Sequence, residues 1–410
     1  MGEDQTAAAA SAAASEANGL PGNEAAEQQG YQLGRGTGPL RGVRVVEIAG
    51  IGPGPHACMI LADLGADVIR VDRPSGGMFA LGEKDVLNRN RPSVCLDLKR
   101  PEAIECVLSL VERADILVEG LRPGVLERLG LGPDECLARN PRLVYGRMTG
   151  WGQDGPLAQA AGHDMNYIGI TGALHGLGQD PSRPHFPTNL LGDFGGGSTY
   201  LVIGVLAALL EAGTNGQGQV VDAAIVDGTA HLNAMGATML AVGLASERRA
   251  VSLLDGGVPY YDIYETADGK HVSVGALEPQ FYDELVRLLE LDLPDRNNPA
   301  NLPEIRAAFS ARFAERTQAE WAELFEGTDA CVGPIIPLAE AAQHPHLVAR
   351  GTFTERDGVL QPAPAPRFSR TPSSIVLSPS TPGTHTRDAL RAWGIADVDE
   401  LLSSGAAVQA

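Results

Sequence analysis

Residues 43–72 read VRVVEIAGIGPGPHACMILADLGADVIRVD and contain the first structural unit of the chain. The run 43–49 is apolar and rich in β-branched residues, as expected of a buried strand, and residues 66–72 repeat that character. Between them, a loop of glycine and proline at 50–55 precedes a helical apolar pattern at 56–64. A strand, a helix and a second strand in this order form a β-α-β unit, which predicts a parallel sheet covered by helices.

A second unit of the same kind follows the first. Residues 93–98 and 115–120 are predicted strands on either side of a helix over 101–114, and residues 143–149 add a further strand. The first loop departs from the dinucleotide-binding fingerprint, because Ala57 stands where its third glycine belongs and two prolines interrupt it. We therefore expect an α/β, Rossmann-like domain that does not bind a dinucleotide through this loop.

The character of the chain changes in its middle part. Residues 260–266 and 271–274 are predicted to pair as strands around an Asp-Gly turn, and amphipathic helices follow at 302–314 and 317–326. This mixture of strands and helices predicts a second, α+β domain. The proline-rich segment 362–382 is expected to run extended and to carry the chain back to the first domain.

The composition restricts the possible partners. The chain has 410 residues and a formal net charge of −20, which argues against nucleic acid or an anionic membrane as a partner. Its five cysteines are scattered without a CxxC pair, so we expect reduced thiols, no metal site and a cytoplasmic location. The apolar run 199–212 is too short for a membrane span and is predicted to be a buried helix. Residues 1–38, mainly Ala, Ser, Glu, Gly and Gln, are predicted to form a disordered tail.

Basic residues gather in one neutral part of this acidic chain. From residue 70 to residue 122, nine Lys and Arg balance nine Asp and Glu. The bases come in small groups, namely Arg70 with Arg73, Arg89 with Arg91, Lys99 with Arg100, and then Arg122. This pattern fits either a solvated charged face or a site for a phosphorylated small molecule.

One histidine and one aspartate lie among glycines. His163 stands in GHDMNY, and Asp193 follows thirty residues later in GDFGGG, before a long apolar stretch. We expect the triple glycine to begin a helix, so that the free N–H groups of residues 193–196 face a ligand beside Asp193. An acid/base pair next to such a site suits removal of a proton beside a carbonyl group. Taken singly, His163 fits a structural histidine and Asp193 fits a helix N-cap.

Seven stretches carry a resemblance to a known family. They are RVVEIAGIGPGPHACMILADLGADVIRVDRP, VEGLRPGVLERLGLGP, GRMTGWGQDGPLAQAAGHDMNYIGITG, LLGDFGGGSTYLVIG, GQVVDAAIVDG, VGALEPQFY and APRFSRTPS. On these stretches, the chain from Pro39 to about Thr371 resembles the 2-methylacyl-CoA (α-methylacyl-CoA) racemases of the family III CoA-transferase superfamily. A histidine before the aspartate of GHDMNY is typical of the racemase branch, whereas the transferase branch carries an aromatic residue there.

The resemblance implies an α/β fold and an assembly. It implies a large Rossmann-like domain from both ends of the chain, a small α+β domain from its middle, and an interlocked homodimer with the active site between the two chains. The expected segments are a tail over 1–38, a large CoA-binding domain over 39–225, a linker helix over 226–250, a small α+β domain over 251–345 and a return segment over 346–410.

The resemblance also implies an activity, the interconversion of (2R)- and (2S)-2-methylacyl-CoA through an enolate. His163 and Asp193 match the catalytic acid/base pair, and Glu278 matches the glutamate that orients the histidine from the other chain. The residues expected to contact substrate or CoA are Arg73, Leu96, Lys99, Arg122, Tyr167, Gly195 and Gly196. CoA is part of the substrate, and neither a metal nor another cofactor is expected.

Alternatives remain open at this point. A CoA-transferase would use Asp193 as a nucleophile, and a silent CoA-thioester-binding protein would use no acid/base pair at all. Without the resemblance, Glu278 reads as an exposed carboxylate at the start of a helix. Met235 and Met239 share one helix face, which fits either core packing or an adaptable surface for an acyl chain.

Overall fold

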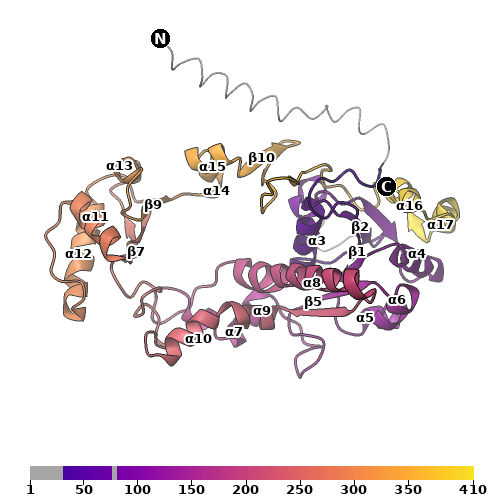
Figure 1. Ribbon diagram of the computed structural model, residues 1–410, viewed down its shortest axis with the longest axis horizontal. Helices are drawn as coiled ribbons and strands as arrows, with labels where there is room; N and C mark the ends of the chain where they lie inside the picture. Colours follow the sequence, from indigo (N-terminus) through magenta and orange to yellow (C-terminus); the bar gives the residue numbers. More distant parts are fainter. Residues whose placement is uncertain (1–30, 76–80) are drawn as a thin grey trace, which may run out of the picture.

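The centre of the molecule is a seven-stranded sheet, seen in the computed structural model, which describes residues 31–75 and 81–410 (Figure 1). Its strands, in the spatial order β12-β3-β2-β1-β4-β5-β6, are β12 (Ala407–Val408), β3 (Ser93–Leu96), β2 (Asp67–Asp72), β1 (Arg44–Ile48), β4 (Ile116–Glu119), β5 (Val144–Thr149) and β6 (Val220–Ala224). All pairs are parallel except that between β12 and β3. The order 3-2-1-4-5-6 is that of a Rossmann-like sheet, so the predicted α/β class is confirmed.

Residues 43–72 form β1, α3 (Pro53–Asp63) and β2. The two strands pair in parallel, with Arg44 opposite Asp67 and Ile48 opposite Val71. The helix begins three residues before the predicted start, because Pro53 fits the first turn, where its missing N–H would have no partner anyway. Gly65 follows the helix with a φ of 102°, and a Cβ there would lie 2.5 Å from the carbonyl oxygen of Thr37.

Helices cover both faces of this sheet, so its inner strands are buried on both sides, whereas the edge strand β6 is partly exposed. One face packs against α3 and α8 (Thr199–Asn215) and buries Leu61, Val68 and Leu201. The other face packs against α4 (Pro101–Val111), α6 (Pro133–Arg139), α16 (Thr386–Ala392) and α17 (Val398–Ser404). With β12 and these last two helices, the C-terminal end of the chain joins the sheet begun by its N-terminal part (Figure 1).

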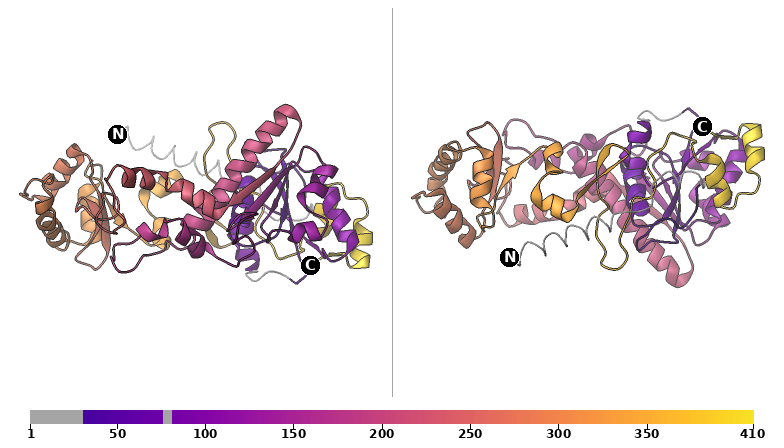
Figure 2. Two further views of the ribbon diagram at one scale, coloured as in Figure 1. Left: turned by 90° about the horizontal axis from the view of Figure 1, so that it is seen from below. Right: turned by 90° about the horizontal axis from the view of Figure 1, so that it is seen from above.

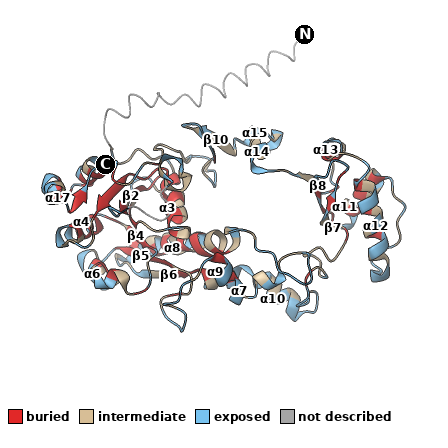
Figure 3. Ribbon diagram, turned by 180° about the vertical axis from the view of Figure 1, so that it is seen from behind, coloured by how far each residue is buried: buried red, intermediate tan, exposed pale blue. Residues whose placement is uncertain are grey.

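A second, smaller core lies at the far end of the molecule (Figures 1 and 2). It is built from the antiparallel strands β7 (Tyr261–Glu265), β8 (His271–Gly275) and β9 (Val332–Ile335) with the helices α11 (Pro279–Leu289), α12 (Leu302–Phe313) and α13 (Gln318–Phe325). Phe309, Phe313 and Trp321 are fully buried between the sheet and the helices. Figure 3 colours the buried segments of these elements red. We refer to this part as the small domain.

Two segments of the chain connect the small domain to the large sheet. On the outward path, α9 (Ile225–Leu232) and α10 (Ala234–Ala241) replace the single linker helix that was predicted over 226–250. The two helices are separated at Asn233, whose backbone is non-helical and which is the N-cap residue of α10 without a side-chain cap hydrogen bond. The return path contains α14 (Leu338–Ala341), α15 (Pro345–Arg350) and a hairpin of β10 (Phe353–Arg356) with β11 (Val359–Pro362).

The predicted tail is shorter than expected at its C-terminal end. Residues 1–30 lie outside the described part of the chain. Tyr31 and Leu33 pack against the core of the large sheet, and the N–H of Gly34 donates to Asp67 Oδ1 at 2.8 Å. The prediction of a disordered tail is therefore wrong for 31–38, because two apolar side chains in this polar stretch find a place in the core.

The apolar helix α8 is buried on one side only. Leu201 and Val205 pack onto the sheet, whereas Ile203 is 57% exposed and Leu210 is 77% exposed. The helical segment Leu190–Asn215 is long and apolar enough to cross a membrane by length and composition, with 39% of its most apolar window buried. The prediction of a buried helix is thus wrong for the outer face of α8, which is apolar and uncovered in a single chain.

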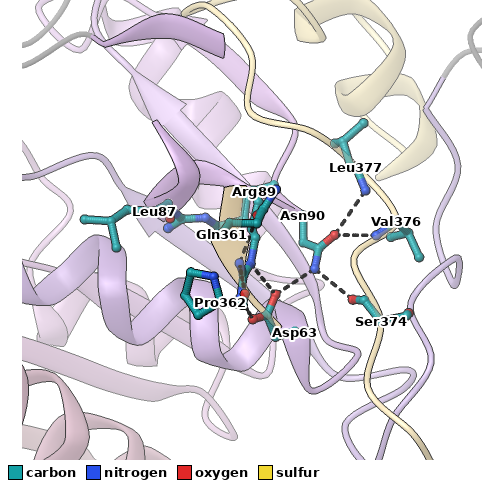
Figure 4. A network of polar contacts seen from close by, with 10 residues as sticks. Asp63, Leu87, Arg89, Asn90, Gln361, Pro362, Ser374, Val376 and Leu377 are labelled. Carbon is teal, nitrogen blue, oxygen red and sulfur yellow. Dashed lines mark hydrogen bonds and ion pairs between the residues drawn. The ribbon is translucent and has the colours of Figure 1, made fainter. Parts of the chain in front are cut away.

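A buried polar network fastens the return path to α3 (Figure 4). The guanidinium of Arg89 donates to both carboxylate oxygens of Asp63 at 3.1 and 2.5 Å, and also to Gln361 and the carbonyl of Pro362. Asn90 donates to Asp63 and to the carbonyl of Ser374, and its side-chain oxygen accepts the N–H groups of Val376 and Leu377. Both charges of this pair are almost completely buried.

Breaking this ion pair on one side should destabilise the protein strongly. Arg89→Met leaves the carboxylate of Asp63 buried without its cation, which should cost about 3–5 kcal/mol of unfolding free energy in urea titrations at pH 7. The double variant Asp63→Leu/Arg89→Met removes both charges and should lose less stability than Arg89→Met alone. If the double variant is less stable than Arg89→Met, the stability lost in Arg89→Met comes mainly from the missing ion pair and not from the uncompensated charge of Asp63.

Candidate active site

A cavity of about 670 Å³ opens at the carboxyl edge of the large sheet. Its walls include Gly52 after β1, Arg122 after β4 and Trp151 after β5. The chain proceeds from β1 outward to β3 on one side and from β4 outward to β6 on the other, so the strand order reverses between β1 and β4. Open α/β sheets bind ligands at such a switch point, and the position of this cavity therefore marks it as the candidate active site.

The cavity brings four of the predicted site residues together. Arg122, His163, Tyr167 and Asp193 line it, whereas Arg73, Leu96, Lys99, Gly195, Gly196 and Glu278 do not. Arg73 and Lys99 are exposed outside it, and the side chain of Leu96 is fully buried in β3, where it cannot contact a ligand. Glu278 is exposed at the N-terminal end of α11 in the small domain.

Asp193 lies in a π-helical segment, Leu190–Ser198, that continues directly into α8. Single π-turns inside α-helices occur often at functional sites. The predicted helix start at the triple glycine is therefore wrong, because the helical turns begin five residues earlier. Gly195 and Gly196 lie inside the helix, and a Cβ on Gly196 would come within 2.4 Å of Thr229 Oγ1, so this glycine serves close packing against α9.

The backbone N–H of Asp193 is also occupied. It donates to Asp164 Oδ2 at 2.6 Å. The prediction that this N–H faces a ligand is thus wrong, because a neighbouring carboxylate has taken it. Asp164 is buried and follows His163 directly in the chain, so one residue is covalently joined to the histidine and hydrogen-bonded to the aspartate. Sequence reasoning missed this connection, although the acidic residue beside His163 was visible.

His163 is the N-cap residue of α7 (Asp164–Ile170). Its N–H donates to the side-chain oxygen of Asn166 at 3.1 Å, which fixes the start of the helix. The residue is exposed, and its imidazole makes no hydrogen bond or ion pair with a carboxylate among residues 31–75 and 81–410. A single chain therefore supplies the histidine without a group that would fix its tautomer.

The environment of Asp193 favours its protonated form. Burial and, second, the charge of Asp164 raise the pKa of Asp193 to about 6, although Asn189 and His163 act in the opposite direction. Gly52 borders the carboxylate, since a Cβ there would lie 3.3 Å from Asp193 Oδ2. A carboxyl group that titrates near neutrality can act both as an acid and as a base.

This raised pKa should appear as a pH-dependent cost in stability. The folded state binds the Asp193 proton more tightly than the unfolded state, so wild-type stability falls as pH rises from about 4 to about 6 and stays lowered above that. Asp193→Asn should therefore gain stability relative to wild type between pH 4 and pH 7 in urea titrations. Asp292→Asn changes an exposed carboxylate and is the control, which should not gain stability over this pH range. If the stability difference between Asp193→Asn and wild type does not change with pH, the raised pKa of Asp193 is contradicted.

Tyr167 shapes the wall of the cavity. Its hydroxyl donates to the carbonyl of Gly162, and its ring packs edge-on against Trp151 at a centroid distance of 4.7 Å. A Cβ on Gly150 would come within 2.0 Å of the ring, so glycine is required there. The hydroxyl of Tyr167 is thus already used within the chain, which leaves the ring as the part of this side chain that faces the cavity.

The basic groups noted in the sequence divide into two kinds. Arg89 and Arg91 are buried in ion pairs with Asp63 and Glu47, so they belong to the protein interior. Arg70 pairs with Asp72 at 2.9 Å. Three bases have no ion-pair partner within the described ranges 31–75 and 81–410, and these are Arg73, Lys99 and Arg122. They remain available for an anionic ligand.

The backbone before Glu278 is held by an arginine that sequence reasoning missed. The guanidinium of Arg296 lies over the rings of Tyr260 and Tyr282, at 4.7 and 4.4 Å from their centroids. It donates to the carbonyls of Ala276 and Leu277, at 3.3 and 3.1 Å. No pattern in the sequence predicted this contact of Arg296 with two aromatic rings.

The described ranges contain no group of three or more His, Cys, Asp or Glu that could hold a metal ion.

Comparison with known proteins places the chain in a family. The profile of CoA-transferase family III matches residues 40–386. The chain belongs to this family. Alpha-methylacyl-CoA racemase of Mus musculus is 43% identical over 369 residues, covering 88% of this chain and 95% of the relative, and that of Homo sapiens is 41% identical, covering 87% and 93%. A CAIB/BAIF family protein from Brucella suis has a similar structure, with a TM-score of 0.74 at 27% identity, covering 87% of this chain and 99% of that one.

Proposed function

We propose that the protein is an isomerase that interconverts (2R)- and (2S)-2-methylacyl-CoA thioesters by 1,1-proton transfer through an enolate. The observation that carries the proposal is one cavity at the switch point lined by both His163 and Asp193. The racemases named above, at 41% and 43% identity over most of both chains, support this class of reaction over others in the family. The exposed Met235 and the half-exposed Met239 on α10 are candidates for contact with the acyl chain.

The reaction needs one proton carrier on each face of the α-carbon. In one direction neutral His163 takes the α-proton, the C–H electron pair moves into the enolate oxygen, and protonated Asp193 returns a proton to the opposite face. In the other direction the Asp193 carboxylate takes the proton and the imidazolium returns one. A pKa of about 6 for Asp193 leaves both of its forms accessible near neutral pH.

The enolate must be stabilised strongly. The α-hydrogen of a thioester has a pKa on the order of 20, so its removal by a group that titrates near 7 is uphill by roughly 18 kcal/mol. Hydrogen-bond donors at the thioester oxygen reduce this barrier. With the Asp193 N–H occupied, the candidates are the first N–H groups of α7, at Asp164 and Met165, which have no acceptor among the described residues.

CoA is proposed to lie along the cavity with its phosphates on the unpaired bases. Arg122 lines the cavity, so Arg122→Ala should raise KM about 10- to 150-fold with little change in kcat, the loss of one charge-assisted contact worth about 1.5–3 kcal/mol. Arg73→Ala should act in the same direction, because this exposed base follows Asp72, which lines the cavity. Arg287→Ala, an exposed residue of the small domain, is the matched control. A large fall in kcat at constant KM would contradict a role of Arg122 in CoA binding and indicate a role in the chemical step.

The active site is proposed to be completed by a second copy of the chain, in an interlocked homodimer. Among residues 31–75 and 81–410 of its own chain, the imidazole of His163 makes no hydrogen bond or ion pair with a carboxylate, and Glu278 does not line the cavity. The apolar outer face of α8 and the exposed Met235 on α10 offer a surface that a second chain would cover. In this arrangement Glu278 of the partner subunit orients the imidazole of His163.

The alternative within the family is a CoA-transferase with Asp193 as nucleophile. The two readings separate in one experiment. Purified protein is incubated with a single epimer of a 2-methylacyl-CoA and with free carboxylic acids, and products are separated chirally. Racemase activity should bring the epimers toward equal amounts without forming a new thioester. Transfer of CoA to the free acid, with the starting epimer unchanged, would establish the transferase instead.

A further inference from the structure

We propose that His56 is a positioning residue for Asp193, acting through a hydrogen-bond relay to the π-helical turn that carries this aspartate. The proposal rests on the acid/base role of Asp193 given above. It concerns a side chain that does not line the cavity and that no step of the reaction uses.

The relay has a defined direction. His56 Nδ1 lies 2.6 Å from Ser198 Oγ, and Ser198 Oγ lies 3.0 Å from the carbonyl oxygen of Phe194. A carbonyl can only accept, so the single hydroxyl proton of Ser198 goes to Phe194. The hydroxyl oxygen must then accept from His56, and Nδ1 of this histidine carries a proton. Burial, with the nearby charges of Arg91 and Arg89, lowers the pKa of His56 to about 4, so the ring is neutral and has this one N–H.

The relay ends on the residue next to Asp193. The carbonyl of Phe194 also accepts the N–H and the hydroxyl of Thr199, the latter at 2.9 Å. A bond from the N–H of residue 199 to the carbonyl of residue 194 spans five residues, which is the π-helical pattern. Ser198 is fully buried, so no water replaces the relay. The hydroxyls of Ser198 and Thr199 thus hold the carbonyl that closes the wide turn around Asp193.

The ring of His56 adds a second contact to the same place. It stacks on the ring of Phe194, with centroids 4.2 Å apart and an interplanar angle of 24°. The backbone of His56 also contacts the loop beside the aspartate, because its N–H donates to the carbonyl of Gly52 at 3.2 Å. Gly52 in turn borders the Asp193 carboxylate, since a Cβ there would lie 3.3 Å from its Oδ2.

His56 therefore connects the start of α3 with the π-helical turn that contains Asp193. A leucine at this position would fill the space on Phe194 but would leave Ser198 without its donor. Loss of the relay frees the turn to shift, and a misplacement of about 1 Å in a reacting group can cost about 100-fold in rate. The effect should fall on the proton transfers of Asp193 and spare those of His163.

The test compares α-hydrogen exchange in the two epimers. In deuterated water, each epimer is deprotonated by the group on its own face, so the initial exchange rates report His163 and Asp193 separately. His56→Phe keeps the ring and removes the donor, and Ser198→Ala removes the relay with little change in volume. Each should lower exchange of one epimer, the one that Asp193→Asn abolishes, about 10- to 100-fold and leave the other within about threefold. The double variant should lose no more than the stronger single variant, because both break one relay.

The control is His231→Phe, which removes a comparable bond between a ring nitrogen and a hydroxyl, that of His231 with Tyr200 at 2.7 Å. It should leave the ratio of the two exchange rates unchanged. Equal losses for both epimers in His56→Phe and Ser198→Ala, or no loss in either, would overturn the relay. If instead Asp193→Asn itself exchanges both epimers at wild-type rates, the acid/base assignment fails first, and the two failures are distinguishable.

Discussion

Asp193→Asn should lower interconversion of the two epimers about 1,000-fold or more, with KM little changed. Removing one of two proton carriers stops inversion, because no group remains on that face to take or return the proton. The remaining imidazole of His163 can still remove a proton and return one to the same face. Asp193→Asn should therefore wash solvent deuterium into only one epimer, with retention of configuration.

His163→Gln supplies the matched half of this experiment. It should abolish inversion to a similar degree and wash deuterium into the other epimer only. Chiral separation followed by mass spectrometry measures both quantities. Full inversion by either variant, or exchange of the same epimer by both, would contradict a mechanism with one carrier on each face.

Glu278→Gln should lower kcat about 100- to 1,000-fold without unfolding the protein. A carboxylate on the second nitrogen of His163 would fix its tautomer and stabilise the imidazolium, as the orienting acid of a catalytic triad does. An amide supplies neither the charge nor the same acceptor. The backbone that carries Glu278 is held by Arg296, so the substitution should leave the small domain intact. Full activity of Glu278→Gln would contradict the proposal that Glu278 orients the imidazole of His163.

Mixed dimers test whether this contact crosses between chains. A His163→Ala chain is co-expressed with a Glu278→Gln chain, and heterodimers are purified with two tags. If the contact crosses, one site lacks both groups and the other has both, so about half of the wild-type activity should remain. If Glu278 serves its own chain, each site lacks one group. Activity no higher than that of the single variants would then contradict the interlocked site.

The large sheet could be predicted from local sequence patterns because its strands are apolar on both faces. Residues 43–72 gave β1, α3 and β2 within a few residues, and the strand pattern of a parallel sheet is hard to mistake. The pairing of β12 with β3 could not be predicted, since a strand of two residues has no periodicity of its own. Likewise, two apolar residues in a polar stretch gave no sign that 31–38 joins the core.

The candidate active site could be predicted only in part. His163 and Asp193 were recognised from their glycine-rich surroundings, and the cavity contains both. The π-helical turn was missed, because its presence depends on where the hydroxyls of Ser198 and Thr199 find acceptors, which is a property of packing rather than of spacing. For the same reason, the triple glycine was taken for a helix start, although Gly196 packs closely against α9.

The most direct test of a two-carrier racemisation is proton NMR of a single 2-methylacyl-CoA epimer in deuterated water with the purified wild-type protein. With one proton carrier on each face, the α-proton signal should disappear, the methyl doublet should collapse to a singlet, and both epimers should accumulate in equal amounts with deuterium at the α-carbon. An α-proton signal that persists with unchanged intensity, while the same preparation passes CoA to an added carboxylic acid, would contradict this mechanism.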